Sequence, residues 1–140
     1  MKLLFDTNVV LDDLLARRPF VDEAQQLFAA VEEKKVEGFL CATTVTTVFY
    51  IAAKAVGARA AKRSLQRLFH LFEVALVDRS VLDKALSMEL ADFEDSVLAA
   101  SASGAGCSAV VTRNPADFKK ARITVYSPAE ALSLLEEPRP

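Results

Sequence analysis

The chain has 140 residues, of which 52% are hydrophobic and 26% are charged, and its formal net charge is -2. This balance is typical of one globular domain with a substantial core, and it excludes an intrinsically disordered chain. A nearly neutral chain has no overall attraction to nucleic acid, so any such binding must be local.

The sequence also argues against a secreted or membrane protein. Cys41 and Cys107 are too few and too far apart for a disulfide framework or a CxxC metal site, which favours two reduced thiols in a core. The first apolar run ends at Asp6, too early for a signal peptide. The longest uncharged stretch, Gly38 to Ala53, contains four threonines and does not resemble a membrane span. We therefore expect a cytoplasmic protein.

Short apolar runs alternate with longer stretches of helical periodicity along the chain. The run from Lys2 to Phe5 predicts a strand, and apolar residues spaced three and four apart predict an amphipathic helix over 21–35. A second strand is predicted over 38–42. Thr43 or Thr44 is suited to cap the next helix, which ends at Gly57.

The second half of the chain continues this alternation. We expect a basic helix over 58–72 and a third strand over 74–77, after which Asp78 or Ser80 is suited to cap a helix that ends at Met88. A helix of small residues follows over 92–103, and then a strand over 109–112. The last elements are a strand over 123–126 and a helix that begins at Pro128 and ends at Glu136.

Strands separated by helices predict an α/β fold: a single domain over 1–140, with a central parallel sheet of four to five strands and helices on both faces. In such sheets the functional groups gather beyond the carboxyl ends of the strands. The polar residues at these positions are Asp6, Thr7, Asn8, Asp78, Thr112, Arg113, Asn114 and Asp117.

Each acidic residue in this set also has a plain structural explanation. Asp6 follows a buried strand, where a carboxylate is costly to desolvate without a partner, but it could equally cap the next helix. Asp92 and Asp95 share one face of a helix, yet they also resemble a capping box at its start. Asn114 precedes a proline and suits a turn, while Asp117 could cap a short helix.

Together, Asp6, Asp95 and Asp117 come from three separate segments that should converge at one edge of the sheet. Crowded carboxylates repel one another and raise each other's pKa. Mg²⁺ or Mn²⁺ relieves this repulsion, because such ions bind oxygen ligands and need only a few carboxylates. The pattern therefore predicts a divalent metal ion as the partner of Asp6, of the kind that activates water and bridges phosphate oxygens.

Three sequence blocks, LLFDTNVVL, DFEDSVLAASA and VVTRNPADF, resemble in this order and spacing the PIN-domain ribonucleases, and among them the VapC-type toxins of bacterial toxin–antitoxin pairs. The resemblance covers essentially the whole chain. It implies a compact α/β domain with a parallel sheet that hydrolyses RNA phosphodiester bonds with Mg²⁺ or Mn²⁺. It also implies an antitoxin protein as a partner, covering the acidic cleft or inserting a basic side chain into it.

By this resemblance Asp6, Asp95 and Asp117 match the family's metal ligands, and Asn8 is a polar support beside them. The family's usual second acid, a glutamate on the helix after the second strand, is missing. The resemblance places Phe49 at that position, and no Asp or Glu occurs from residue 38 to residue 72.

This departure leaves two alternatives open: weaker metal binding, or a degenerate site that no longer cuts RNA. Asp92 lies one turn from Asp95 and is a candidate catalytic residue that takes over part of the missing work. Thr46 and Tyr50 are candidate neutral contacts from the helix that carries Phe49. We expect an active endoribonuclease.

Two clusters of basic residues are candidate contacts to RNA phosphates. The first, on the helix over 58–72 and just before it, is Lys54, Arg59, Lys62, Arg63 and Arg67, and a solvated helix face explains it equally well. The second, which is Arg113, Lys119, Lys120 and Arg122, surrounds Asp117 and adjoins the expected metal site. From it we select Arg113, Lys119 and Lys120, together with Asn114 and Thr46, as RNA-binding residues. His70 lies among apolar neighbours, so we expect it to be packed and not catalytic.

Two other functions share parts of this pattern. Asp6, Asp78 and Thr112 resemble the acids and threonine of response-regulator receiver domains, but no lysine follows the last strand and Asp78 suits a helix cap. A non-catalytic binding module of the same fold is the second alternative, and the missing glutamate supports it. A mean hydropathy of +0.23 and the amphipathic amino-terminal helices also allow a homodimer.

Overall fold

Five short strands pair in parallel in the order β3-β2-β1-β4-β5. The computed structural model describes residues 1–136. The strands are β1 (Lys2–Phe5), β2 (Glu37–Cys41), β3 (Glu73–Ala75), β4 (Ala109–Val111) and β5 (Thr124–Tyr126). This arrangement confirms the predicted α/β fold with a central parallel sheet; residues 137–140 of the expected domain lie outside the described part.

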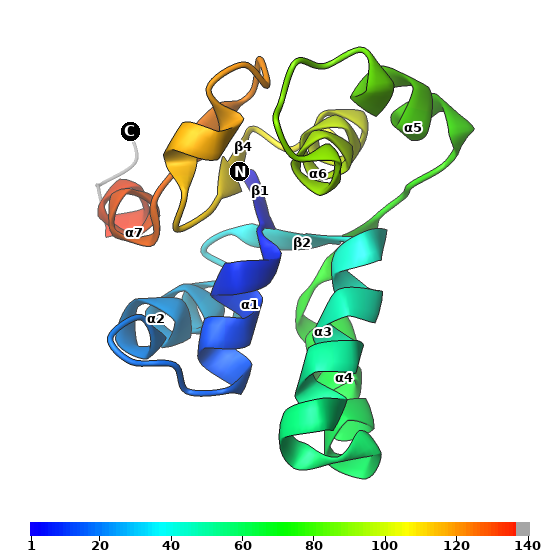
Figure 1. The fold of residues 1–140 in the computed structure, drawn as a ribbon. Helices are drawn as coiled ribbons and strands as arrows, with labels where there is room; N and C mark the ends of the chain where they lie inside the picture. Colours follow the sequence, from blue (N-terminus) through cyan, green and yellow to red (C-terminus); the bar gives the residue numbers. More distant parts are fainter. Residues whose placement is uncertain (137–140) are drawn as a thin grey trace.

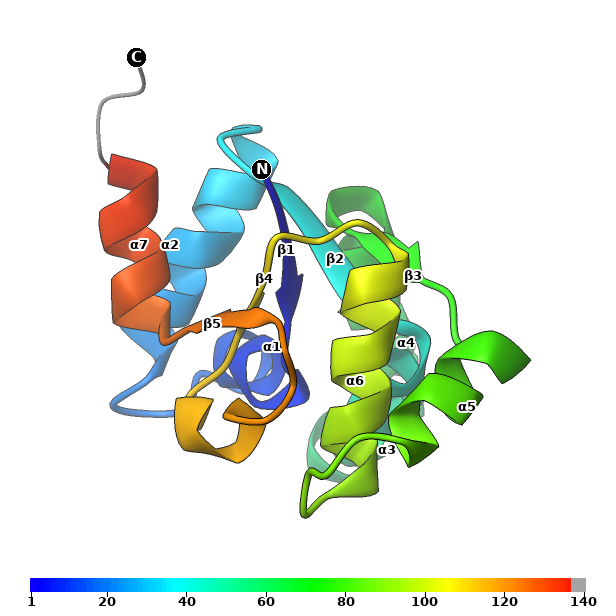
Figure 2. The same ribbon diagram turned by 90° about the horizontal axis from the view of Figure 1, so that it is seen from above.

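Helices connect the strands and cover both faces of the sheet (Figures 1 and 2). They are α1 (Thr7–Leu14), α2 (Val21–Glu32), α3 (Ala42–Val56), α4 (Ala58–Leu71), α5 (Arg79–Leu86), α6 (Phe93–Gly104), the short 3-10 helix η1 (Pro115–Phe118) and α7 (Pro128–Glu136). Among these 136 residues no helix is long and apolar enough to cross a membrane.

Several local predictions were wrong. Two helices end early: α2 at Glu32, three residues before its predicted end, and α5 at Leu86, two residues before. The helix after the second strand begins at Ala42, with Cys41 as its N-cap residue and no side-chain capping bond, so Thr43 and Thr44 lie inside α3 and do not cap it. The third strand ends at Ala75, two residues before the predicted end. For α5, the structure selects Asp78 over Ser80 as the cap, because the Asp78 side chain accepts the N–H of Val81 at 3.0 Å.

The core lies in two layers because successive residues of a strand face opposite sides of the sheet. Leu3 and Phe5 of β1 pack with buried residues of α1, α2, α3, α4 and α7 on one face. Leu4 packs with buried residues of α5 and α6 on the other. Figure 2 shows α6 lying along its face of the sheet, with α5 beside it.

Small side chains let α6 lie close to the sheet. Its residues from Ser96 to Ala102 are all buried, and among them are Ala99, Ala100 and Ala102. The opposite layer is filled by aromatic rings: Phe72 packs edge-on against Phe5 and Phe28, with ring centroids 5.5 and 5.1 Å apart.

The pairing of β1 with β4 brings distant parts of the chain to one edge of the sheet. Phe5 is in register with Val111. The next residue, Asp6, donates its backbone N–H to the carbonyl of Val111 at 2.9 Å. Thr112 in turn donates its N–H to the carbonyl of Tyr126 at 3.0 Å, so the segments that follow three strands meet here.

Candidate functional site

Asp6 lies at the carboxyl end of β1 and is held by two hydrogen-bond donors. Its Oδ1 accepts the backbone N–H of Thr7 at 2.7 Å, which makes Asp6 the N-cap of α1. Its Oδ2 accepts the hydroxyl of Thr112, also at 2.7 Å. Asp6 therefore caps α1, the structural role that the sequence analysis gave as an alternative. Its carboxylate also lies at the edge of the sheet where we expected the functional residues.

The pKa of Asp6 is raised above its ordinary value. Burial is the largest cause, and the charge of Asp117 adds to it. The bonds from Thr112 and Thr7 and the charge of Arg113 act in the opposite direction, but they do not cancel the effect of burial. A buried carboxyl group at this position gains from any cation that restores its charged form.

Asp95 belongs to the first turn of α6, and its environment shows how the acids are grouped. Its pKa is raised to about 7, first by burial and then by the charges of Asp6, Asp92, Asp117 and Glu94. Repulsion of this kind falls with distance. The charges of Asp6 and Asp117, which belong to two other segments, therefore act on Asp95. That the acids at 6, 95 and 117 bind one ion stays a prediction.

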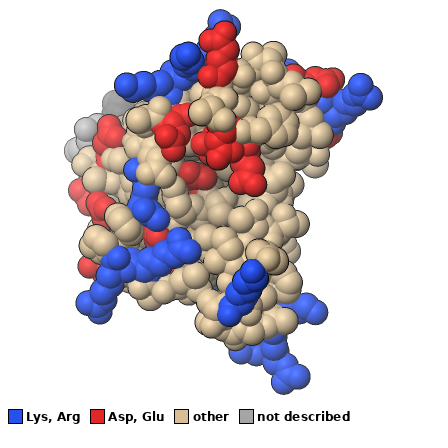
Figure 3. All heavy atoms as spheres, viewed as in Figure 1, with Lys and Arg blue, Asp and Glu red and all other residues tan. Residues whose placement is uncertain are grey.

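Asp92 and Asp117 have more solvent around them than Asp6. Asp92 is the N-cap of α6, and its Oδ1 accepts the N–H of Glu94 at 2.8 Å. Asp117 lies within η1 and is exposed. In Figure 3 acidic side chains gather in the upper middle of the face shown, and lysine and arginine side chains lie above, to the left of and below this group.

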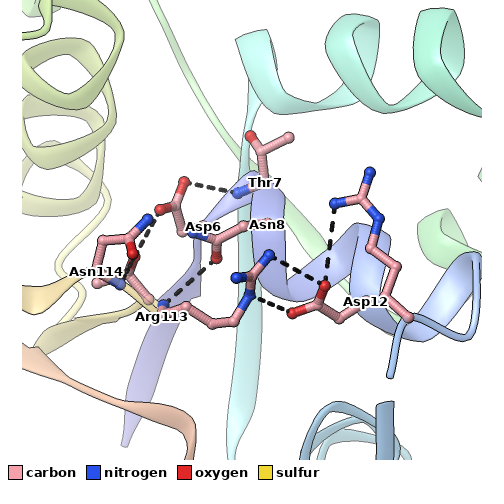
Figure 4. A network of polar contacts seen from close by, with 8 residues as sticks. Asp6, Thr7, Asn8, Asp12, Arg113 and Asn114 are labelled. Atoms are coloured by element: carbon pink, nitrogen blue, oxygen red, sulfur yellow. Dashed lines mark hydrogen bonds and ion pairs between the residues drawn. The ribbon is translucent and has the colours of Figure 1, made fainter. Parts of the chain in front are cut away.

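A second network joins α1 to the segment after β4 (Figure 4). The Asn8 Oδ1 atom faces the backbone N–H of Arg113 at 3.5 Å, a long hydrogen bond. The Arg113 guanidinium donates to both carboxylate oxygens of Asp12, at 2.7 and 3.4 Å. It also lies 3.9 Å from the centre of the Phe20 ring. Arg113, selected above as an RNA contact, is therefore fastened to α1.

Asp12 is the residue of this site that the sequence analysis missed. It is only 1% exposed, and Arg17 approaches it at 4.0 Å in addition to Arg113. A buried carboxylate of this kind needs such partners. The sequence did contain one indication of its role: Asp12 comes four residues after Asn8 and so lies on the same face of α1.

The helix α3 meets the site with hydroxyl groups instead of a carboxylate. Thr44 is buried, and its Oγ1 lies 2.9 Å from the Oγ1 of Thr7. Thr47, one turn further along α3, shares this side of the helix. Thr46 is exposed, with its hydroxyl donating to the carbonyl of Thr43 at 2.9 Å.

The remaining predicted RNA contacts lie at the border of the acidic group. Asn114 donates its backbone N–H to the hydroxyl of Thr112 at 3.1 Å. Lys119 and Lys120 follow η1 and are exposed. The expectation that His70 is packed was wrong, because its side chain is exposed at the end of α4.

The chemistry of these donors suits a hard divalent cation, since all of them are oxygen atoms and several repel one another. Residues 1–136 nevertheless contain no group of three His, Cys, Asp or Glu side chains arranged to hold one ion. The residues therefore fit an ion that one or two carboxylates hold and that keeps several waters, which is the usual state of Mg²⁺ in proteins.

Solved structures similar to this chain share its fold. A DNA-bound VapBC complex from Salmonella typhimurium matches with a TM-score of 0.71 and 16% identity, over 91% of this chain and 98% of the other. A toxin–antitoxin complex from Klebsiella pneumoniae matches with a TM-score of 0.67 and 24% identity, over 90% and 97%. VapC20 of Mycobacterium tuberculosis, described as a sarcin-ricin-loop-cleaving toxin, matches with a TM-score of 0.62 and 16% identity, over 77% and 86%.

The sequence itself carries a family signature. No curated protein matches the sequence of this chain. The family model for the PIN domain does match, over residues 2–116, a range that includes Asp6 and Asp95 and ends one residue before Asp117. The chain therefore belongs to the PIN domain family.

Proposed function

We propose that this chain is a divalent-metal-dependent endoribonuclease. The observation that carries the proposal is the raised pKa of Asp95, caused after burial by the carboxylates of Asp6, Asp92 and Asp117. Acids from three segments that repel one another at the carboxyl edge of a parallel sheet are a suitable place for Mg²⁺ or Mn²⁺. Membership of the PIN domain family supports the same reaction.

In this proposal Asp6, Asp95 and Asp117 are the metal-binding acids, of which one or two would contact the cation directly, and Asp92 supplies further negative charge beside Asp95. When bound, the ion supplies Lewis-acid activation of the scissile phosphate and of water. Thr112 and Thr7 orient the Asp6 carboxylate by their hydrogen bonds.

The segment after β4 positions the substrate in this proposal. Asn8 supports it through its contact with the backbone of Arg113. The RNA contacts are Arg113, Asn114, Lys119, Lys120 and Thr46, which lie at the border of the acids or on the exposed face of α3.

We also propose that the chain is a cytoplasmic toxin of a toxin–antitoxin pair, with an antitoxin protein and a second copy of the chain as partners. Support comes from the VapBC and toxin–antitoxin complexes that share its fold. Pull-down of an affinity-tagged chain with the product of a neighbouring gene, and its mass in solution, test these two partners.

The test of the activity is cleavage of a mixed RNA by the purified chain in MgCl₂ or MnCl₂. We expect cleavage that EDTA abolishes and that is lost in Asp6→Asn. Asp83→Asn is the matched control, because Asp83 is an exposed acid on α5 whose one ion pair within residues 1–136 is with Arg79, at 3.8 Å. Cleavage that persists in Asp6→Asn would exclude the proposed site.

A non-catalytic RNA-binding module is the second candidate. It is favoured by the absence of any acid from α3 and of a complete three-carboxylate group among residues 1–136. RNA binding without cleavage in either metal would select it. A receiver-like function has no comparable support, because Asp78 is occupied as the cap of α5.

A further inference from the structure

A groove of about 680 Å³ lies between α6 and the segment that follows η1. Its floor includes Ala100 and Ser103 of α6. One wall is the end of α5 with the residues after it, including Lys84 and Glu89. The opposite wall is the segment of residues 119–122.

The charges that line this groove are strongly unbalanced. Four cations line it, namely Lys84, Lys119, Lys120 and Arg122, against one carboxylate, Glu89. Glu89 lies 3.8 Å from Lys120. Within the described part of the chain, Lys84, Lys119 and Arg122 form no ion pair. Uncompensated positive charges on facing walls attract a polyanion.

Both walls of the groove belong to segments that also carry acids of the site, although none of the acids at 6, 92, 95 and 117 lines the groove itself. Lys119 comes two residues after Asp117, and Glu89 comes three residues before Asp92. On the floor, Ala100 and Ser103 follow Asp95 along α6; at a rise of 1.5 Å per residue they lie about 8 and 12 Å beyond it. A strand with one phosphate at the acids would therefore place its next phosphates in the groove.

We propose that this groove binds the single-stranded RNA that flanks the scissile phosphate, and that Lys84 and Arg122 are additional phosphate contacts. The inference rests on the proposed ribonuclease function and adds the path of the substrate. Lys84 reaches the groove from α5, far in sequence from the other basic residues.

The lining favours RNA over a protein segment. Met88 is the one large apolar side chain among its lining residues, and the other uncharged ones, Ser87, Ala100, Ser103 and Ala121, are small, so few groups are present to hold a large anchoring side chain. Tight protein interfaces depend on such anchors. A phosphodiester backbone needs only cations along its path, and cations are present on both walls.

The experiment measures RNA binding by fluorescence anisotropy over a series of salt concentrations. The parent protein carries Asp6→Asn, so that a labelled single-stranded oligonucleotide of mixed sequence stays intact in MgCl₂. Lys84→Gln and Arg122→Gln should each weaken binding several-fold at low salt. Each should also reduce the slope of log K against log salt by about 0.7, the value for one lost phosphate contact to a single strand.

Arg79→Gln is the matched control, because Arg79 carries the same charge on the same helix but does not line the groove. Its slope should equal that of the parent, and equal thermal midpoints should show that all variants are folded. Unchanged slopes for Lys84→Gln and Arg122→Gln would overturn the inference. So would loss of a co-purifying protein from both variants while their RNA affinity is kept.

Failure of the inference and failure of the proposed function give different results. Cleavage of the same oligonucleotide by the wild-type chain in MgCl₂ reports the function independently of the groove. If the wild type cleaves and the two groove variants bind like the parent, the groove inference alone is wrong. If the parent binds no RNA, the inference is wrong, and the cleavage assay decides the function.

Discussion

The hydroxyl of Thr112 donates a hydrogen bond of 2.7 Å to the carboxylate of Asp6, joining the residue that follows β4 to the one that follows β1. The other carboxylate oxygen accepts the N–H of Thr7. These two bonds lower the pKa of Asp6, while burial raises it more strongly. The orientation of Asp6 is therefore set by the fold itself, without a ligand.

Replacing Thr112 by valine removes the hydroxyl and keeps the shape of the side chain. We expect Thr112→Val to lower the free energy of unfolding by about 1–3 kcal/mol, because a buried carboxyl group loses a donor. The N–H of Asn114 loses its acceptor at the same time. Urea unfolding at pH 7.5 measures the change.

Thr124→Val is the control for this substitution, because Thr124 is exposed on β5. Its effect should stay within about 0.5 kcal/mol, as is usual for surface positions. If both variants lose equally little, Thr112 does not determine how Asp6 is held.

The raised pKa of Asp95 predicts how the stability of the metal-free protein depends on pH. The folded chain keeps a proton on Asp95 up to its raised pKa of about 7, whereas the unfolded chain releases it near the ordinary pKa of 3.8. Between these values the folded state binds more protons, so the free energy of unfolding falls as pH rises. The raised pKa values of Asp6 and Asp13 act in the same direction.

Thermal midpoints in EDTA from pH 4.5 to 8 test this prediction. The midpoint of the wild type should fall over this range, and Asp95→Asn should fall less and melt higher than the wild type at pH 8. Asp83→Asn is the control for the loss of one carboxylate outside the acidic group. Equal pH dependence in the wild type and Asp95→Asn would contradict the assignment.

Much of the fold could be predicted from the sequence because its apolar spacing is regular. The strand ending at Phe5 and the helix of small residues over 92–103 lie within one residue of their predicted ends. The grouping of Asp6, Asp95 and Asp117 followed from one rule, that parallel strands end at the same edge of a sheet. The roles of these acids as metal ligands stay a prediction.

Other features depend on contacts between distant segments, which spacing alone does not reveal. Asp12 and Asp13 are neighbours in sequence, yet Asp12 pairs with Arg113 and Asp13 with Arg67 of α4. The start of α3 at Ala42 was missed because its N-cap residue, Cys41, makes no side-chain capping bond. Lys84 could not be assigned to the groove before the packing of α5 was known.

The ion pair between Asp12 and Arg113 should be important for stability. Asp12→Asn leaves the guanidinium without its carboxylate partner in a mostly buried setting, where the Asp12 side chain is 2% exposed and that of Arg113 25% exposed. Removing one partner of a buried pair is expected to lower the free energy of unfolding by about 3–5 kcal/mol. Urea unfolding measures it.

The exposed pair of Arg79 and Asp83, with side chains 92% and 64% exposed, provides the comparison. Asp83→Asn should change the free energy of unfolding by less than about 1 kcal/mol. If Asp12→Asn also lowers the free energy of unfolding by less than about 1 kcal/mol, the ion pair is not what holds the segment after β4 in place.

Gly38 is required by the close approach of an aromatic ring. A Cβ atom at this position would lie 2.5 Å from the ring of Phe72, which is itself packed against Phe5 and Phe28. Gly38→Ala should therefore lower the free energy of unfolding by about 1–3 kcal/mol through overpacking. In Gly104→Ala the nearest contact is 3.9 Å away, so that variant should be neutral or slightly stabilising.

A carboxylate introduced on α3 tests whether the missing acid limits metal binding. Thr47 lies one turn beyond Thr44, whose hydroxyl is 2.9 Å from that of Thr7, next to Asp6. Phe49, two residues later, points to another side of the helix, since successive residues are about 100° apart. The geometry of α3 therefore favours position 47 over position 49 for an added ligand.

We expect Thr47→Glu to bind Mn²⁺ more tightly than the wild type in isothermal titration, because a further carboxylate joins the acids around Asp95. Gln66→Glu, at an exposed position on α4, controls for the added negative charge and should leave the affinity unchanged. Tighter binding in Phe49→Glu but not in Thr47→Glu would show that the resemblance had aligned the missing acid correctly. In that case the side of α3 that faces the acids would not be the one that carries Thr44. The hydroxyl contact between Thr44 and Thr7 would then be no guide to where an added ligand belongs.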